Sequence, residues 1–564
     1  MPDAHETYTT LTRRLGDGEH TVLFRKAGSP QDLPHIFRPL KPSVSEENGI
    51  VAERDVAVVM RDGATIYTDV LRPAGADNAP AVIAWSSPGK SYTFHSRGGT
   101  GGLVPEGALS PLAKQEGPDP AYWCHYGYAV INPDPRGVGN SDGDIQFLSE
   151  TEYDDIYDLI EWTAQQPWSN GKVAMHGTAF SGVTAWFAAA KRPPHLACIA
   201  PWEAFSDLYR DVLVRGGVVD SQMFGHVLSR LRGNGGLEDV VAMAEEHPLM
   251  NGYWEEKAAR IENIDIPVYV TANVNLFHQA GLRAFEELTT PHKWLRIHNS
   301  ISWRDLYLPD NLEDLRRFFD RYLKGIHNGW EFTPPVRLSL YDSAGDTVNR
   351  PEPEWPPART EHRAFYLDAS DGSLSPTPVG QESAIRYAAD GTGEASFVLP
   401  FENVGETVGY GKLRLWVEAV GADDMDLFVT LQRLDADGRP LPIPFYGQPH
   451  GGVSGVLRVS HRELDGAKST DSRPVPAHRR QLPLEPGQIT AVDIPLWPFG
   501  YVWNPGEQLR VTVSDRPRRA GSGADLLPDT RWNLANKGEH IIHTGGKYDS
   551  LLLLPVLPAR SGPN

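Results

Sequence analysis

The chain has 564 residues, of which 40% are hydrophobic and 22% charged, so its composition is that of an ordinary globular protein and excludes a low-complexity or collagen-like chain. Its formal net charge of −20 argues against a nucleic-acid-binding protein and a polybasic membrane anchor, because both need a basic face. Two cysteines cannot form a disulfide framework. The polar N-terminus and the lack of a long apolar stretch predict a cytoplasmic protein.

The first half of the chain alternates strand-like and helix-like patterns. Residues 1–50 are polar and are expected to lie as an extension over a domain, and two alternating strands follow around the turn at Asp62 and Gly63. Further short apolar runs predict strands, and runs with helical spacing between them predict helices: strands at 81–85, 128–132, 172–176, 197–200, 268–272 and 294–298, and helices at 151–166, 183–191 and 311–324. This alternation predicts an α/β fold with a parallel sheet.

The remaining stretches divide the chain into domains. Residues 203–263 are helical and irregular and fall between two sheet strands, so they are expected to form a cap over the active site. From residue 341 onward, alternating strands are broken by Gly, Pro and Asp, and no long helical period remains. The sequence therefore predicts an extension at 1–50, an α/β domain at 51–340 with its cap, and a β-sandwich at 341–564.

The segment at 172–186, KVAMHGTAFSGVTAW, is the most informative one for chemistry. It combines a strand, a tight glycine turn and a helix, which is the geometry of the nucleophile elbow of α/β-hydrolases. The position two residues after Gly177 would carry the nucleophile, and it holds Ala179, whose methyl group cannot attack a carbonyl. Ser181 is the alternative nucleophile, but it falls in the first helical turn, where a serine usually bonds to backbone.

This segment resembles the elbow of the X-Pro dipeptidyl-peptidase and bacterial cocaine esterase family, whose pattern is Gly-x-Ser-x-x-Gly. Gly177 and Gly182 match that pattern, and Ala179 stands at the serine position. Further matches follow in the family's order: GYAV at 127–130, PRG at 135–137, IAP at 199–201, SDLYR at 206–210 and FFDRYLKG at 318–325. The resemblance implies an α/β-hydrolase domain with a helical cap, a C-terminal jelly roll, and hydrolysis of an ester or amide.

The resemblance also implies positions for the acid and the base. The family's acid follows the strand after the cap, where Asn275 stands in this chain, and His278 lies nearby as a second candidate for the base. The family's base lies in the loop after the next strand, and direct register puts Ser302 there. His298 lies four residues earlier, at the end of that strand, and is the best candidate because histidine is the usual general base.

The oxyanion of the reaction would be held by the backbone N–H of Phe180. The family's second donor is a tyrosine, and its position holds Pro88, which has neither a hydroxyl nor an N–H. Glu203 and Asp207 follow the strand after the elbow and serve either as pocket acids or in solvated or capping roles. His176 is expected to be buried in the elbow strand. Aromatic residues at strand ends, together with His278, are expected to line an apolar pocket, although tryptophans are mostly core residues: Trp85, Tyr92, Trp123, Trp202 and Trp303.

Two explanations of Ala179 stay open. A deliberate Ser→Ala replacement explains Ala179 alone, whereas natural loss of the serine also covers Asn275 and Pro88. The leading hypothesis is a serine hydrolase whose chain, as written, is inactive. The alternatives are a non-hydrolytic enzyme, carrying out cyclisation, elimination or proton transfer on a small apolar substrate, and a binding protein. We expect a small-molecule substrate, no cofactor or catalytic metal, and a flat jelly-roll surface suited to a homodimer.

Overall fold

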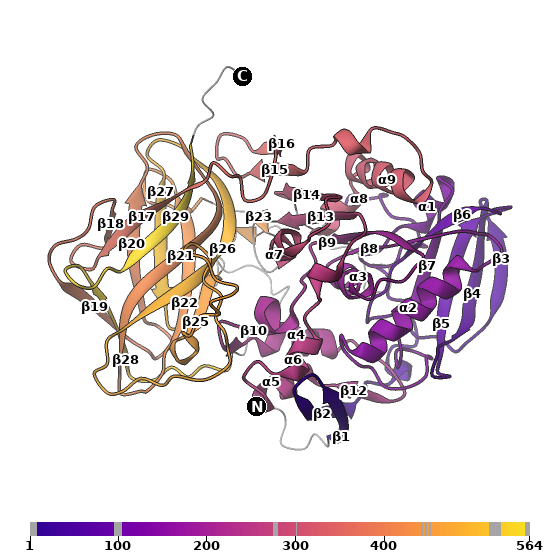
Figure 1. Cartoon of the computed structure of the whole chain (residues 1–564), viewed down its shortest axis with the longest axis horizontal. Coiled ribbons are helices and arrows are strands. Elements are labelled where there is room, and N and C mark those ends of the chain that lie inside the picture. The colour runs from indigo at the N-terminus through magenta and orange to yellow at the C-terminus, as the bar shows by residue number, and fades with distance from the viewer. Residues whose placement is uncertain are drawn as a thin grey trace.

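The computed structural model describes residues 8–94, 104–273, 280–300, 302–441, 444–445, 448–449, 453–517 and 532–558. Figure 1 shows an α/β half that holds the first part of the chain and a β-rich half that holds the last part. Within the described ranges, no helix combines the length and the apolar character needed to cross a membrane.

An eleven-stranded sheet forms the centre of the α/β domain, in the order β16-β15-β14-β13-β9-β8-β6-β7-β5-β4-β3. The strands from β7 to β15 are parallel, as their apolar runs predict, and the strands at the two edges are antiparallel. The bounds are β3 Ser43–Glu47, β4 Ile50–Val59, β5 Thr65–Pro73, β6 Ala79–Ile83, β7 Ala129–Asp134, β8 Ser169–Thr178, β9 Leu196–Trp202, β13 Val268–Asn273, β14 Lys293–His298, β15 Val336–Leu340 and β16 Thr347–Glu352.

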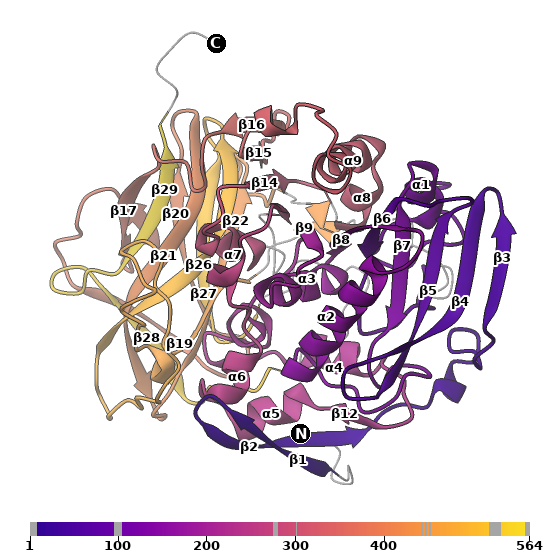
Figure 2. The ribbon, with the colours of Figure 1, turned by 45° about the vertical axis from the view of Figure 1, so that its right-hand side comes forward.

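Helices cover both faces of this sheet (Figure 2). Alternate residues of β6 show this directly, since Ala81 and Ile83 pack with the residues of α2 and α3 while Val82 packs with those of α1, α8 and α9. The inner strands β6 and β13 are covered on both faces and buried at every position, which explains why they are apolar runs. The bounds are α1 Pro120–His125, α2 Glu150–Ala164, α3 Phe180–Ala190, α7 Ala280–Glu287, α8 Ser302–Tyr307 and α9 Pro309–Leu323.

The insertion between β9 and β13 is helical and irregular, as its sequence predicts. It contains the π-helix η2 Tyr209–Leu213, the short strands β10 Val214–Arg215, β11 Val218–Val219 and β12 Gly236–Glu238, the helices α4 Ser221–Leu228, α5 Val240–Glu246 and α6 Gly252–Glu256, and the 3-10 helix η3 Ile261–Asn263. The N-terminal extension forms a hairpin of β1 Thr9–Leu15 and β2 Gly18–Lys26, and β2 pairs with β12 (Figure 1). The extension therefore lies against the insertion, and its last strand, β3, joins the edge of the main sheet.

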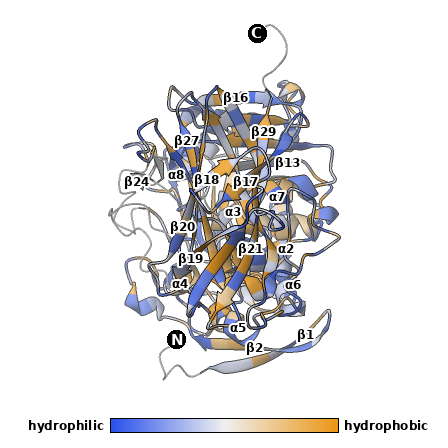
Figure 3. Cartoon of the chain, turned by 90° about the vertical axis from the view of Figure 1, so that its left-hand side faces the viewer, coloured by the Kyte–Doolittle hydropathy of each residue, from blue (hydrophilic) through white to orange (hydrophobic). Residues whose placement is uncertain are grey.

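The C-terminal domain is a β-sandwich. Its two longest strands, β21 Gly405–Val420 and β26 Thr490–Trp503, pair antiparallel, and β21 alternates buried and half-buried residues along most of its length. Figure 3 shows the corresponding alternation of hydrophilic and hydrophobic positions on the strands of this domain. The α/β sheet continues past residue 340 through β16, so the sandwich strands begin only with β17, Glu361–Asp368.

Candidate active site

The elbow predicted from the sequence is present between β8 and α3. Ala179 is the single residue between them, with φ 50° and ψ −124°, a backbone conformation that is strained for a residue with a side chain. A Cβ on Gly177 would lie 2.3 Å from the Cβ of Ser181, and a Cβ on Gly182 would lie 2.6 Å from the carbonyl oxygen of Gly177. Both positions therefore need glycine, and the turn has the tight geometry of a nucleophile elbow although its tip carries a methyl group.

Neighbouring segments fix the elbow from two sides. The N–H of Ala179 donates to the carbonyl of Trp202 at 3.0 Å, and the N–H of Thr178 donates to the carbonyl of Glu116 at 3.0 Å. Among the described residues, the N–H of Phe180 has no acceptor, as expected of the first residue of a helix, so it is available to an oxyanion. Ser181 is 1% exposed, and its side chain lies against Gly177, so it belongs to the packing under the turn.

His298 and Glu203 lie together at the carboxyl edge of the sheet. The Nε2 atom of His298 lies 2.8 Å from Oε1 of Glu203, and the two side chains are 5% and 1% exposed. In this orientation, Nε2 forms no hydrogen bond with any described residue, while Nδ1 accepts the N–H of Ser300 at 3.3 Å. Glu203 directly follows β9, adopts a φ of 48° and donates its own N–H to the carbonyl of Thr271 at 2.8 Å.

The surroundings of this pair are polar and buried. The Ser302 hydroxyl donates to the second carboxylate oxygen of Glu203. Arg296 forms a two-point ion pair with Asp305, with distances of 2.9 and 2.5 Å, and Asp305 lies 3.5 Å from Nδ1 of His298. Burial raises the pKa of Asp305, but the charges of Arg296 and His298 and the hydrogen bonds from Arg296 lower it by more, so this carboxyl stays ionised.

The loop that follows β6 contains Pro88 and is firmly anchored. The N–H of Gly89 donates to the carbonyl of Ser86 at 3.0 Å, and Lys90 donates its N–H to Asp134 at 2.7 Å and its ammonium to Asp69 at 2.7 Å. Burial raises the pKa of Asp134 to about 7. Because proline has no N–H, this anchored turn contributes no donor at the position of Pro88.

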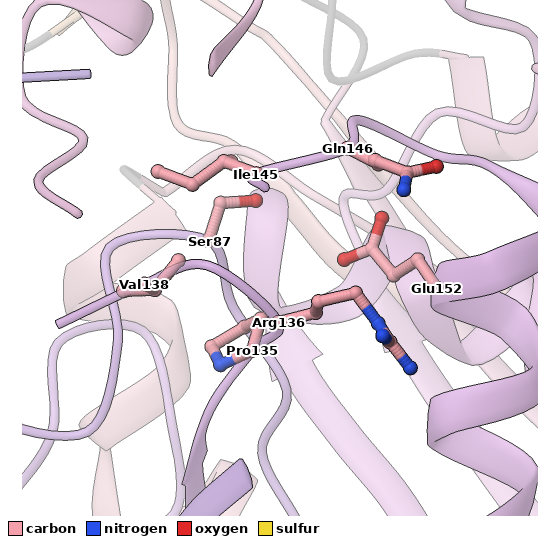
Figure 4. A pocket seen from close by; sticks show the side chains of 7 residues that line it. All are labelled: Ser87, Pro135, Arg136, Val138, Ile145, Gln146 and Glu152. Atoms are coloured by element: carbon pink, nitrogen blue, oxygen red, sulfur yellow. The ribbon is translucent and has the colours of Figure 1, made fainter. Parts of the chain in front are cut away.

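A small pocket lies beside this loop (Figure 4), lined by Ser87, Pro135, Arg136, Val138, Ile145, Gln146 and Glu152. Glu152 accepts the indole N–H of Trp85 on one oxygen and the N–H of Leu148 on the other, both at 2.8 Å. Burial raises the pKa of Glu152 to about 7. Trp85 is thus tied to a carboxyl in the pocket wall while its own ring is fully buried.

Comparison with known proteins identifies the family. A family model described as X-Pro dipeptidyl-peptidase (S15 family) matches residues 62–301, and one described as X-Pro dipeptidyl-peptidase C-terminal non-catalytic domain matches residues 328–553. The crystal structure of a CocE/NonD family hydrolase from Staphylococcus aureus is 31% identical, covers 93% of this chain and all of its own, and superposes with a TM-score of 0.84. The chain belongs to the X-Pro dipeptidyl-peptidase and cocaine esterase family.

Other relatives support the same assignment, and the resemblance inferred from the elbow motif is confirmed. The cocaine esterase of a Rhodococcus species is 23% identical over 89% of this chain and 98% of its own. An α-amino acid ester hydrolase, at 19% identity and a TM-score of 0.65, shares the fold. The chain is therefore a member of a hydrolase family with the family's C-terminal domain.

The sequence predicted the family's nucleophile, oxyanion donor and base at positions 179, 88 and 302. These positions hold Ala179, Pro88 and Ser302, and the Ser302 hydroxyl donates to Glu203. Asn275 and His278, expected at or near the acid, lie outside the described residues. The structure brings together His298 and Glu203, of which the sequence singled out His298 as the base and left Glu203 open between two roles.

The aromatic residues that the sequence predicted in the pocket lie in different parts of the α/β domain. Trp85, Trp123 and Trp202 are buried in the core, and Tyr92 is 6% exposed. Trp303 is half-buried, and its indole N–H donates to the carboxylate of Glu116 at 2.9 Å.

Glu116 and His176 also contact the segments around the elbow. The carbonyl of Glu116 accepts the N–H of Thr178, and its carboxylate accepts the indole N–H of Trp303. Glu116 therefore places Trp303 close to the elbow, and no local sequence pattern indicated this contact. His176 is buried in β8 with Nδ1 2.8 Å from the carbonyl of Ala200, and burial lowers its pKa to about 4, so it is a core histidine as expected.

Proposed function

We propose that this site is an ester- or amide-cleaving site of the serine hydrolase type in which Ala179 occupies the nucleophile position. The chain as it stands then binds an acyl substrate without forming an acyl-enzyme. The observation that carries this proposal is the backbone of Ala179, held at φ 50° between two close-packed glycines. Such strain is typically retained where it exposes a reactive side chain at the tip of the turn. A methyl group at that tip only packs and gains nothing from the strain.

With serine at position 179, each remaining group has a role. His298 takes the proton of the serine hydroxyl as that hydroxyl attacks the carbonyl, and later returns it to the leaving group. The N–H of Phe180 stabilises the oxyanion, and Pro88 supplies no second donor. Loss of one oxyanion donor typically costs about 100- to 1,000-fold in rate, so a restored enzyme of this kind is slow by the standards of its fold.

The experiment is the substitution A179S, assayed with activated p-nitrophenyl esters. We expect ester hydrolysis that the Ala179 chain lacks, and we expect the double variant A179S/S181A to retain it. Hydrolysis that disappears with S181A would move the nucleophile to Ser181. The codon at position 179 in the source gene distinguishes the two origins of Ala179, because a serine codon means that alanine was introduced.

A second candidate function is proton transfer by His298 without a covalent intermediate. It is favoured by one observation, the close and buried contact between His298 and Glu203 that persists although the nucleophile is absent. The test incubates the Ala179 chain with a panel of small esters and lactones and monitors products by mass spectrometry. Turnover that disappears with H298N and is unchanged by S181A supports this function, and a panel without any turnover argues against it.

A further inference from the structure

We propose that Glu203 is the carboxylate partner of His298, a positioning residue that performs the task expected of the acid position at Asn275. The inference deepens the proposed function and rests on it for its catalytic meaning. Resemblance alone would leave the base of this enzyme without a carboxylate, because asparagine carries no charge to stabilise a protonated imidazole. Glu203 supplies that charge from a different strand.

The sheet topology explains how Glu203 reaches His298. β9 lies between β8 and β13, and β14 lies beyond β13. The N–H of Glu203 bonds to Thr271 of β13, and Thr271 is paired with Arg296 of β14, two residues before His298. The Glu203 side chain therefore passes across the end of β13 to meet the imidazole from the side of the elbow strand.

Charge and burial favour this role for Glu203 over Asp305. Asp305 is occupied by two hydrogen bonds from Arg296 and lies 3.5 Å from Nδ1, which is too long for a hydrogen bond of ordinary strength. Oε1 of Glu203 lies 2.8 Å from Nε2, and Ser302 binds the other oxygen and so limits rotation of the carboxylate. A carboxylate this close in a buried setting is placed to stabilise a positive charge that forms on the imidazole.

The Nε2 atom of His298 can form a hydrogen bond with a further group. This atom is buried and forms no hydrogen bond within the described part of the chain, because Glu203 is close to it but not aligned with its N–H direction. Glu203 can thus act on His298 through its charge. Nε2 accepts a proton from a hydroxyl in the tautomer that carries the ring hydrogen on Nδ1, the atom that faces Asp305 at 3.5 Å.

The first test uses A179S and the rate at which a fluorophosphonate labels it as a function of pH. We expect E203Q to slow labelling by about 100-fold and to move the midpoint of the pH dependence down by about one to three pH units. E203D keeps the charge one methylene further away, so the midpoint should move in the same direction by less. A purely structural role would lower the amount of active protein and leave the midpoint in place, which would overturn the proposal.

The second test does not depend on esterase activity. The ring-proton NMR signal of His298, identified by its absence in H298N, is followed against pH in the Ala179 chain with and without E203Q. The matched control is E161Q, since Glu161 pairs with His195 at 2.7 Å elsewhere on the molecule. A lower midpoint in E203Q alone supports the proposal, and an unchanged one overturns it, even where A179S shows no labelling and the proposed function fails.

Discussion

The backbone N–H of Ala179 donates a 3.0 Å hydrogen bond to the carbonyl of Trp202, the residue directly before Glu203. The strained turn and the buried carboxylate are therefore held at adjacent points of the same sheet edge. In the function proposed above, this edge keeps the backbone of an acyl-hydrolase site, with its glycines and its histidine, and lacks the reactive hydroxyl.

Replacing Ala179 with glycine should stabilise the protein. Relief of an unfavourable backbone conformation is worth roughly 1–3 kcal/mol, and the greater freedom of unfolded glycine offsets about 0.5–1 kcal/mol of it. We expect A179G to raise the free energy of unfolding by about 1 kcal/mol in urea titrations. The matched control is A185G, in the interior of α3, which should lower it by about 1 kcal/mol or more. A loss of stability in A179G would mean that the turn is not strained.

Adding a methyl group at Gly177 should destabilise the protein. A Cβ there would come within 2.3 Å of the Cβ of Ser181, in a part of the fold that is closely packed. Overpacking of this kind typically costs about 1–3 kcal/mol, and we expect G177A to fall in that range. The control is G405A at the start of β21, where no described atom lies within 4 Å of the added methyl. Equal stability of the two variants would contradict the close contact.

Two buried histidines predict loss of stability in acid. The Nδ1 atoms of His461 and His478 lie 2.9 Å apart, and the ring of Tyr209 from the insertion packs on His478 with the centroids 5.3 Å apart. Burial lowers the pKa of His461 to about 4, and burial together with His461 lowers that of His478. The charged groups around them are Arg458 and Asp426 near His461, and Arg210 and Asp207 near His478.

The direction in which pH changes the free energy of unfolding follows from these lowered pKa values. Near pH 6.5 and below, the unfolded histidines bind protons that the folded ones do not, so the free energy of unfolding falls as pH drops from about 6.5 towards 4. Each histidine contributes up to about 1.4 kcal/mol per pH unit. We expect H461Q to flatten this dependence in urea titrations at several pH values. The same slope in H461Q and the parent chain would show that the pair does not titrate with folding.

Local patterns were sufficient for the elements that carry the elbow. The apolar run before Gly177 and the helical spacing after it predict β8 and α3, and the glycine spacing fixes the position of Ala179 between them. The contact of Glu203 with His298 could not be predicted in this way, because it depends on the order of three strands and on a side chain crossing the end of the middle one.

Composition alone did not indicate the boundary between the two domains correctly. The shift near residue 340 indicated the start of the sandwich, yet β16, which follows that boundary, still belongs to the α/β sheet. The edge strand β16 lacks the apolar run of the inner strands, so only its pairing with β15 shows that it belongs to the α/β sheet. Trp123 illustrates the same point for side chains, since its ring packs against Tyr128 and Phe319 in the core.

Whether position 179 is the nucleophile site is tested by the intact mass of A179S after exposure to a fluorophosphonate. We expect one covalent adduct, mapped by peptide analysis to the serine introduced at position 179, and no adduct on the Ala179 chain under the same conditions. The double variant A179S/H298N should label far more slowly if His298 is the base. An adduct on Ser181, or an A179S chain that stays unmodified while folded, would contradict the assignment of position 179 as the nucleophile site.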